Sequence, residues 1–213
     1  MLNWLKRLPM FVQVLGASLI GFWLILQFQP ERDPVAEQQL PWNAFFDESG
    51  KLHALGLTLD ESTLNDAIAL YGKDVEMKLF SDLDESNKSI EAYFPVIYIG
   101  SIKAALAVSI DAPKEALEKA FSKGKNIVMS STGGREVELF NADKVPFLSM
   151  PIASLTLLPR NHLTERAIEM RFGAPDSREI QSDKLEHLYF NKLGLELIID
   201  PEGPEALQYT TGR

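Results

Sequence analysis

The longest run of hydrophobic positions in the chain lies near its start, at Leu8–Phe28. Its 21 residues include no charged side chain, and a helix of that length spans roughly the 30 Å hydrocarbon core of a bilayer. Lys6 and Arg7 precede the run and Glu31 follows it, so the positive-inside rule places the N-terminus in the cytoplasm. We therefore predict a single transmembrane helix in a bacterial inner membrane, with the bulk of the chain in the periplasm.

Two details of this run bear on its role in the membrane. No small-residue cleavage site follows Phe28, so we expect the run to be retained as a signal anchor. Gly16 and Gly21 flatten the helix surface and would let another membrane helix approach closely. These two glycines are therefore candidate helix–helix contacts.

Polar positions follow the run and then give way to a helical pattern. A polar segment with two prolines predicts a spacer, and we assign residues 29–52 to a linker. The sequence LTLDESTLNDAIALYG then has apolar residues at helical spacing, after a capping-box pattern formed by Thr58 and Glu61. Gly72 supplies a stop signal, so this segment predicts a short amphipathic helix.

The next segments have the pattern of β-hairpins separated by a helix. Pro95 lies inside the first strand-like run and indicates an edge strand or a bulge. Two consecutive glycines permit the tight turn of the second hairpin. The predicted elements are strands at 92–99 and 102–110, a helix at 112–123, and strands at 126–130 and 136–140.

The helix-then-hairpin pattern returns in the last third of the chain, which favours an internal duplication. A helix again ends at a glycine, Gly173, and is followed by a hairpin at 185–200 and a strand at 206–210. The fold class predicted is α+β, with an N-terminal single transmembrane helix before a periplasmic domain of two helix-plus-antiparallel-hairpin units. The predicted organisation is a cytoplasmic N-terminus at 1–7, the transmembrane helix at 8–28, the linker at 29–52, and units at 53–150 and 151–213.

The second unit carries a resemblance to a known family. Its features are the helix end RFGAP, Arg171 to Pro175, and the aromatic hairpin LYFNKLGLELIID, Leu188 to Asp200. Over about residues 160–200 the chain resembles the SmpA/OmlA-like outer-membrane assembly lipoproteins, whose repeat architecture is shared by β-lactamase-inhibitor protein. The resemblance implies a module that binds proteins through its sheet face and performs no chemistry.

Composition excludes several classes of partner and site. The chain has 21 basic and 30 acidic residues, and the part beyond the apolar run is more acidic still because Lys6 and Arg7 precede the run. A negative field repels nucleic acid and anionic head groups, so we predict no nucleic-acid partner. The chain has no cysteine, which excludes an acylated N-terminal cysteine, disulfides and thiolate zinc sites.

Candidate chemistry is sparse. His162 falls on one predicted helical face with Glu165 and Glu169, an arrangement that could bind metal but is also common on solvated surfaces. No G-x-S-x-G motif is present, and the acidic loop at 82–85 lacks the spacing of a calcium loop. We therefore predict no catalytic residue, no metal site and no cofactor, and a protein that is not an enzyme. The three histidines are His53, His162 and His187.

Aromatic residues in the predicted strands are the remaining candidates for a binding surface. Tyr93, Phe94, Tyr189 and Phe190 are candidate partner-binding residues, because alternate strand residues face opposite ways and one of each pair should face outward. The function predicted is a membrane-anchored, non-catalytic protein-interaction module, an accessory subunit with a protein partner in the inner membrane or periplasm. Two alternatives stay open: a small-ligand binder or sensor between the two units, and a cell-envelope hydrolase.

Overall fold

The structure of the protein is a computed structural model that describes residues 18, 21–23, 36–129, 134–201 and 203–212. The chain divides into two compact units, Met1–Pro34 and Val35–Arg213. In the first unit the described residues are Ser18 and Gly21–Trp23, and all of them are helical. The described strands belong to the second unit.

The prediction of a transmembrane helix requires correction. Among the residues that the structure describes, no helix is long and apolar enough to cross a membrane. A crossing takes about 20 helical residues, whereas the helix α3, Lys114–Ser122, has nine. Most of Leu8–Phe28, including Gly16, lies outside the described residues. The same finding contradicts four further predictions that depend on this helix: the signal anchor, the single membrane span, the membrane partner and the inner-membrane location.

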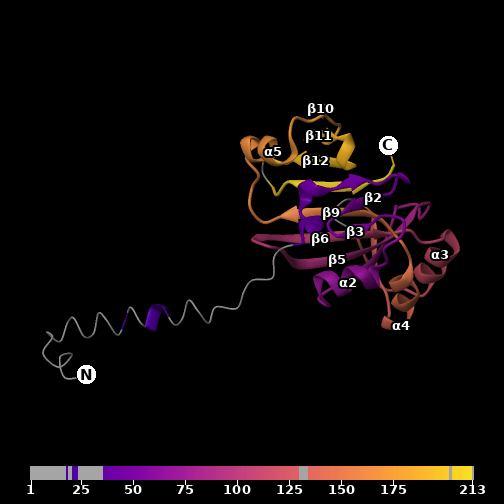
Figure 1. The fold of residues 1–213 in the computed structure, drawn as a ribbon. Helices are drawn as coiled ribbons and strands as arrows, with labels where there is room; N and C mark the ends of the chain where they lie inside the picture. The colour runs from indigo at the N-terminus through magenta and orange to yellow at the C-terminus, as the bar shows by residue number, and fades with distance from the viewer. Residues whose placement is uncertain (1–17, 19–20, 24–35, 130–133, 202, 213) are drawn as a thin grey trace, which may run out of the picture. The chain divides into compact units, whose positions relative to one another are not determined.

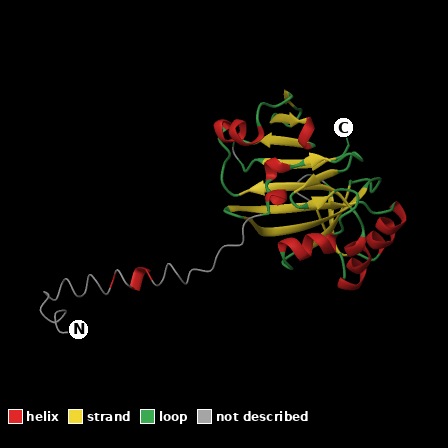
Figure 2. Ribbon diagram, viewed as in Figure 1, coloured by secondary structure: helices red, strands yellow, loops and turns green. Residues whose placement is uncertain are grey.

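The second unit is built on one large antiparallel sheet (Figures 1 and 2). Ten strands lie in the order β10-β11-β12-β13-β9-β6-β5-β4-β8-β7, and a smaller sheet has the order β1-β2-β3. The strands are β1 Phe45–Phe46, β2 Leu52–Ala54, β3 Leu57–Thr58, β4 Glu76–Ser81, β5 Lys88–Ile99, β6 Ile102–Ile110, β7 Lys125–Met129, β8 Arg135–Glu138, β9 Ile152–Pro159, β10 Ser177–Ile180, β11 Glu186–Phe190, β12 Leu195–Ile199 and β13 Ala206–Thr210.

This architecture corrects the predicted fold class of two helix-plus-hairpin units. The chain from Val35 on is mostly β, and strands from both sides of the predicted boundary at residue 150 pair with one another. The strand that joins them is β9, which pairs with β6 along one edge and with β13 along the other. The two predicted units are therefore parts of one continuous sheet.

The helices are short and lie on one side of the large sheet. Their buried side chains, on α2, α3 and α5, all belong to the core cluster, together with the inward-facing residues of the strands. The helices are α2 Leu64–Tyr71, α3 Lys114–Ser122, α4 Asn141–Lys144 and α5 Glu165–Phe172, with 3-10 helices at η2 Glu37–Gln39, η3 Pro41–Asn43, η4 Val145–Ser149 and η5 Asn191–Leu193.

The segment just before the small sheet packs on the same side of the large sheet as the helices. The hydroxyl of Tyr209, in β13, donates a 2.7 Å hydrogen bond to the carbonyl oxygen of Pro41. The ring of Trp42 meets that of Phe172 edge-on, with 6.3 Å between centroids. Residues 36–52, which the sequence pattern placed in a linker, thus contribute to the core and cover one face of the large sheet.

The opposite face of the large sheet carries no described helix, and we call it the open face. Because side chains alternate along a strand, the neighbours of core residues on each strand face this side. Tyr93 is such a neighbour of Phe94, and Ala107 is such a neighbour of Leu106. Ala107 pairs with Thr156 on β9, which pairs with Gln208 on β13, so the open face crosses strands on both sides of residue 150.

Candidate functional site

A row of cross-strand neighbours defines the middle of the open face. Small or uncharged side chains occupy its centre, while aromatic and acidic side chains lie toward both ends. The row, taken from the strand register, is Glu76, Tyr93, Ala107, Thr156, Gln208, Glu196 and Tyr189. Two hollows lie along this face and a third lies at its border with β1; each is described below by its lining residues.

The four aromatic residues predicted to bind a partner divide between the two faces. Tyr93 faces outward with 37% of its surface exposed, whereas Phe94 is 1% exposed in the core. Phe190 is also part of the core, and Tyr189, on the other face, is 2% exposed. Tyr93 and Tyr189 lie on β5 and β11, with four strands between them, so the structure does not bring them together. Of the predicted glycine contacts, only Gly21 is described, and it has nothing within 4 Å of an added Cβ.

The first hollow is acidic and measures about 150 Å³. It is lined in part by Glu76, Lys78, Glu91, Tyr93 and Glu136. Lys78 donates to Glu136 at 2.8 Å and lies 3.9 Å from Glu76, so a single positive charge faces the three carboxylates of this hollow. Glu91 is half-buried, and among the described residues its carboxylate has neither a hydrogen bond nor an ion pair. Burial raises the pKa of Glu91.

The second hollow shares Tyr93 with the first and measures about 370 Å³. Its floor is apolar, and Arg160 and His162 contribute the polar groups. The Nδ1 atom of His162 lies 3.2 Å from Oε1 of Glu205, a carboxylate that is only 5% exposed. The other oxygen of Glu205 has no hydrogen-bond partner within the described part of the chain. His162 therefore contacts Glu205, on the approach to β13.

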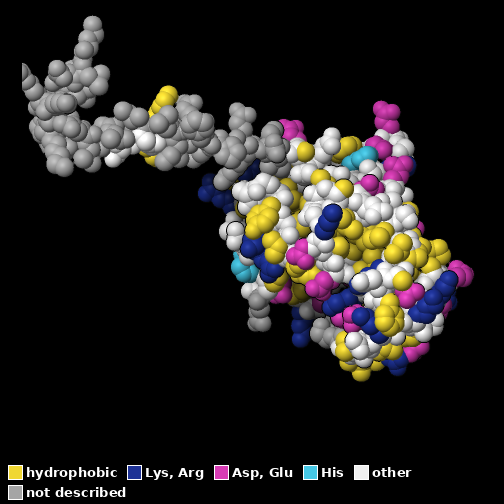
Figure 3. Space-filling model, turned by 90° about the horizontal axis from the view of Figure 1, so that it is seen from below, with side chains coloured by type: hydrophobic (Ala, Val, Ile, Leu, Met, Phe, Trp, Pro, Cys, Tyr) yellow, Lys and Arg dark blue, Asp and Glu magenta, His cyan; other side chains and the backbone are white. Residues whose placement is uncertain are grey.

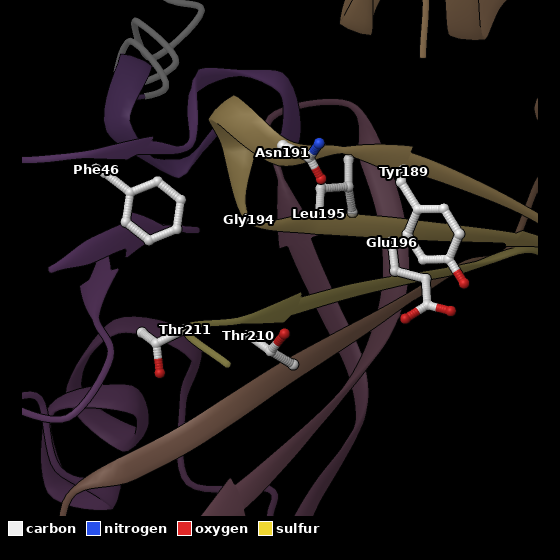
Figure 4. Close-up of a pocket in the computed structure, with 8 residues that line it drawn as sticks. All are labelled: Phe46, Tyr189, Asn191, Gly194, Leu195, Glu196, Thr210 and Thr211. Carbon is white, nitrogen blue, oxygen red and sulfur yellow. The ribbon is translucent and has the colours of Figure 1, made fainter. Parts of the chain in front are cut away.

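The third hollow lies where β1 meets the turn between β11 and β12, and it measures about 280 Å³. Figure 4 shows Phe46 on one side of it and Tyr189 with Glu196 on the other, and it places Thr210 and Thr211 near the end of β13. Gly194, in the turn, has φ +55, and an added Cβ would come within 2.5 Å of Leu52. The glycine thus permits the close approach that shapes this hollow.

A buried hydrogen-bond network lies behind the third hollow. Nδ1 of His187 is 2.7 Å from Oε1 of Glu196, and Nε2 is 3.0 Å from Oδ2 of Asp183. The amide of Gln181 donates to the hydroxyl of Tyr189 at 2.6 Å. Burial lowers the pKa of His187, but its hydrogen bonds to Glu196 and Asp183 more than offset this, so the pKa is raised above its ordinary value of 6.5.

Sequence reasoning named His187 but missed its partners. Glu196 and Tyr189 are opposite one another in the β11–β12 hairpin, and His187 is two residues before Tyr189 on the same face. Assigning a strand register to the predicted hairpin could have identified this cluster, because the register places the side chains of His187, Tyr189 and Glu196 on one face. The turn includes η5, whose length the sequence pattern did not define.

The third histidine lies on the small sheet and lines none of these hollows. Nε2 of His53 is 3.0 Å from Oδ2 of Asp47, and Nδ1 is 2.9 Å from the hydroxyl of Thr58. The hydrogen bond from His53 holds the pKa of Asp47 well below its usual range, with help from Ser49 and Lys51. In the described residues, no group of three or more histidine and acidic side chains could hold a metal ion.

Comparisons with known proteins add no family to this picture. No protein-family model matches the chain, and no curated protein or solved structure is similar enough to count as a match. The resemblance of residues 160–200 to the SmpA/OmlA-like repeats therefore stays a prediction. The candidate site is accordingly defined by geometry alone, as the open face and its three hollows.

Proposed function

We propose that this protein is a non-catalytic protein-interaction module that binds a basic segment of a partner protein on the open face. The observation that carries the proposal is the pair Glu91 and Tyr93. A half-buried carboxylate without an ion-pair partner lies two residues from an exposed aromatic ring, on a sheet face that no described helix covers.

The chemistry of Glu91 selects the partner. A carboxylate that is partly removed from water and left unpaired is unfavourable, and a Lys or Arg side chain would offset that loss by an ion pair. Tyr93 supplies an aromatic anchor of the kind that concentrates binding energy in interfaces. The small side chains at the centre of the row, such as Ala107, leave room for an approaching chain.

The charge of the whole chain favours the same partner. The formal net charge is −9, so a basic segment is attracted over distances comparable to the Debye length, about 8–10 Å. Charged side chains of both signs lie among hydrophobic ones on the face seen in Figure 3. Local pairing, rather than net charge alone, therefore has to discriminate one binding surface from another.

The test is the binding of the full chain to an array of capped synthetic peptides, with matched Lys/Arg-rich and Asp/Glu-rich sets. We expect the basic peptides to bind and the Glu91→Gln variant to bind them about tenfold more weakly, which corresponds to about 1.4 kcal/mol. Glu115→Gln is the matched control, because it removes the same charge from an exposed position on α3. Equal binding by both variants, or preference for acidic peptides, would overturn the proposal.

A further inference from the structure

The third hollow, lined by Phe46, Tyr189, Asn191, Gly194, Leu195, Glu196, Thr210 and Thr211, is organised around one carboxylate (Figure 4). Glu196 is 23% exposed, and both of its hydrogen bonds reach the same oxygen. His187 lies 2.7 Å from Oε1, and the amide of Gln181 lies 3.4 Å from it. Within the described residues Oε2 accepts no hydrogen bond, so it is the oxygen left to a ligand.

The network behind Glu196 holds this carboxylate in one position. His187 is 3% exposed, and its two ring nitrogens are fixed by Glu196 on one side and Asp183 on the other. Tyr189 is held by the hydrogen bond from Gln181. Binding groups whose orientation is locked by buried neighbours lose little conformational entropy when a ligand arrives.

The charge of this network is negative at the hollow. Both ring nitrogens of His187 face carboxylate oxygens, so the protonated ring, an imidazolium, donates to both of them. The three groups Asp183, His187 and Glu196 then sum to one negative charge, and Glu196 is the carboxylate that lines the hollow. A cation is therefore the complementary ligand.

The walls of the hollow are also suited to a cation. The ring of Phe46, which is 38% exposed, lines one side, and an aromatic face attracts ammonium and guanidinium groups. Tyr189, which is 2% exposed, forms the wall on the other side. Thr210, Thr211 and Asn191 contribute side-chain oxygens that can accept hydrogen bonds from N–H donors. The volume of about 280 Å³ is at the lower end for small-molecule sites, so the hollow accommodates a charged group with a short alkyl chain.

We propose that this hollow is a binding site for an organic cation, an ammonium or guanidinium group carried by a short alkyl chain. The group belongs either to a free amine or to a Lys or Arg side chain of a protein. The inference does not depend on the proposed function, because it concerns Glu196 and not Glu91, and a free amine binds without any protein partner.

The test is a titration of the full chain with butylammonium, methylguanidinium and butyrate, followed by the NMR signals of the His187 ring. The chain has three histidines, so His53 and His162 are internal references. We expect both cations, but not butyrate, to shift the His187 signals saturably. Glu196→Gln should lower the affinity for both cations at least tenfold, whereas Glu91→Gln should leave that affinity unchanged.

A second variant guards against loss of structure in Glu196→Gln. Phe46→Ala removes one aromatic wall at a half-exposed position and leaves the His187 network in place. This variant should lower the affinity for both cations several-fold. Capped lysine and arginine amides test the side-chain source, since their binding indicates a protein ligand and their exclusion indicates a free amine. Equal shifts with butyrate, no saturable shift with either cation, or unchanged cation affinity in Glu196→Gln would overturn the inference.

Discussion

The imidazole of His187 lies 2.7 Å from the carboxylate of Glu196, on the neighbouring strand of the same hairpin. The contact joins a buried titratable ring to the carboxylate that lines the third hollow. Asp183 lies on the other side of the ring, so that each nitrogen faces a carboxylate oxygen and both donate when the ring is protonated. The stability of this end of the sheet is therefore linked to pH.

We predict that the free energy of unfolding contributed by His187 falls as pH rises. The pKa of His187 is raised in the folded state, because its hydrogen bonds to Glu196 and Asp183 outweigh the effect of burial. A raised pKa stabilises the fold fully below the unfolded value of about 6.5, and this stabilisation is lost as pH rises through the folded pKa. Urea unfolding of the wild type and of His187→Gln at several pH values between 5.5 and 8.5 measures this contribution of His187 to the free energy of unfolding.

The informative quantity is the difference in unfolding free energy between the wild type and His187→Gln at each pH. That difference should shrink toward the alkaline end, because the neutral ring can donate to only one of its two carboxylates. A difference that stays constant across the range would contradict the prediction.

Truncation to Ala should destabilise the fold much more at one of two adjacent residues on β5 than at the other. Phe94→Ala removes a fully buried ring and should destabilise the fold by about 3–5 kcal/mol. Tyr93→Ala acts on the open face and should cost less than about 1 kcal/mol, while weakening the binding of basic peptides. Thermal unfolding of the two variants checks this, and similar losses of stability would show that the open face is covered.

Local signals in the sequence were enough for most hairpins. The predicted hairpin at 92–110 is confirmed as β5 and β6, and Pro95 marks a bulge between Phe94 and Ile97 rather than an edge strand. The hairpin at 126–140 is confirmed as β7 and β8, and the one at 185–200 as β11 and β12. These elements combine β-branched or aromatic runs with turn residues, so short-range chemistry specifies them.

The sequence pattern did not predict which strands pair when they are distant in the chain. Residues 155–157 lie inside β9, a strand that the sequence pattern did not predict and whose partners β6 and β13 are distant in the chain. The first predicted helix also begins later than expected, at Leu64, because Thr63 and Asp66 form the capping box in place of Thr58 and Glu61. Nothing local distinguishes these alternatives, since both depend on which residues the rest of the fold buries.

For the candidate site, alternation predicted that one residue of each aromatic pair faces outward, and Tyr93 does so. Alternation did not predict that Tyr189 is buried. Side chains such as Gln181 contact it, and their positions do not follow from a hairpin pattern. The hollow lined by Phe46 and Glu196 depends on contact between β1 and the turn at η5. Residues so far apart in the chain meet only through the tertiary fold.

The hydrogen bond between Tyr209 and Pro41 should measure how firmly the segment before β1 is attached. Tyr209→Phe keeps the buried ring but leaves the Pro41 carbonyl without this donor, which should cost about 1–2 kcal/mol. Hydrogen exchange of the backbone amides of Leu40, Trp42 and Asn43, which flank Pro41, should accelerate more in this variant than exchange in β5. Uniform acceleration throughout the sheet would instead indicate a loss of global stability.

The contact between His162 and Glu205 should respond asymmetrically to the removal of each partner. His162→Ala leaves a buried carboxylate with no partner in the described chain, and should destabilise the fold by about 1–3 kcal/mol even though His162 itself is largely exposed. Replacing both residues, as His162→Ala with Glu205→Leu, removes the unpaired charge and should recover most of that loss, because an apolar side chain of similar size suits a buried site. A double-mutant cycle of urea unfolding measures the coupling. If the changes in unfolding free energy of the two single variants simply add, water or another group already forms a hydrogen bond with Glu205. The oxygen Oε2 of Glu205 would then carry no energetic cost.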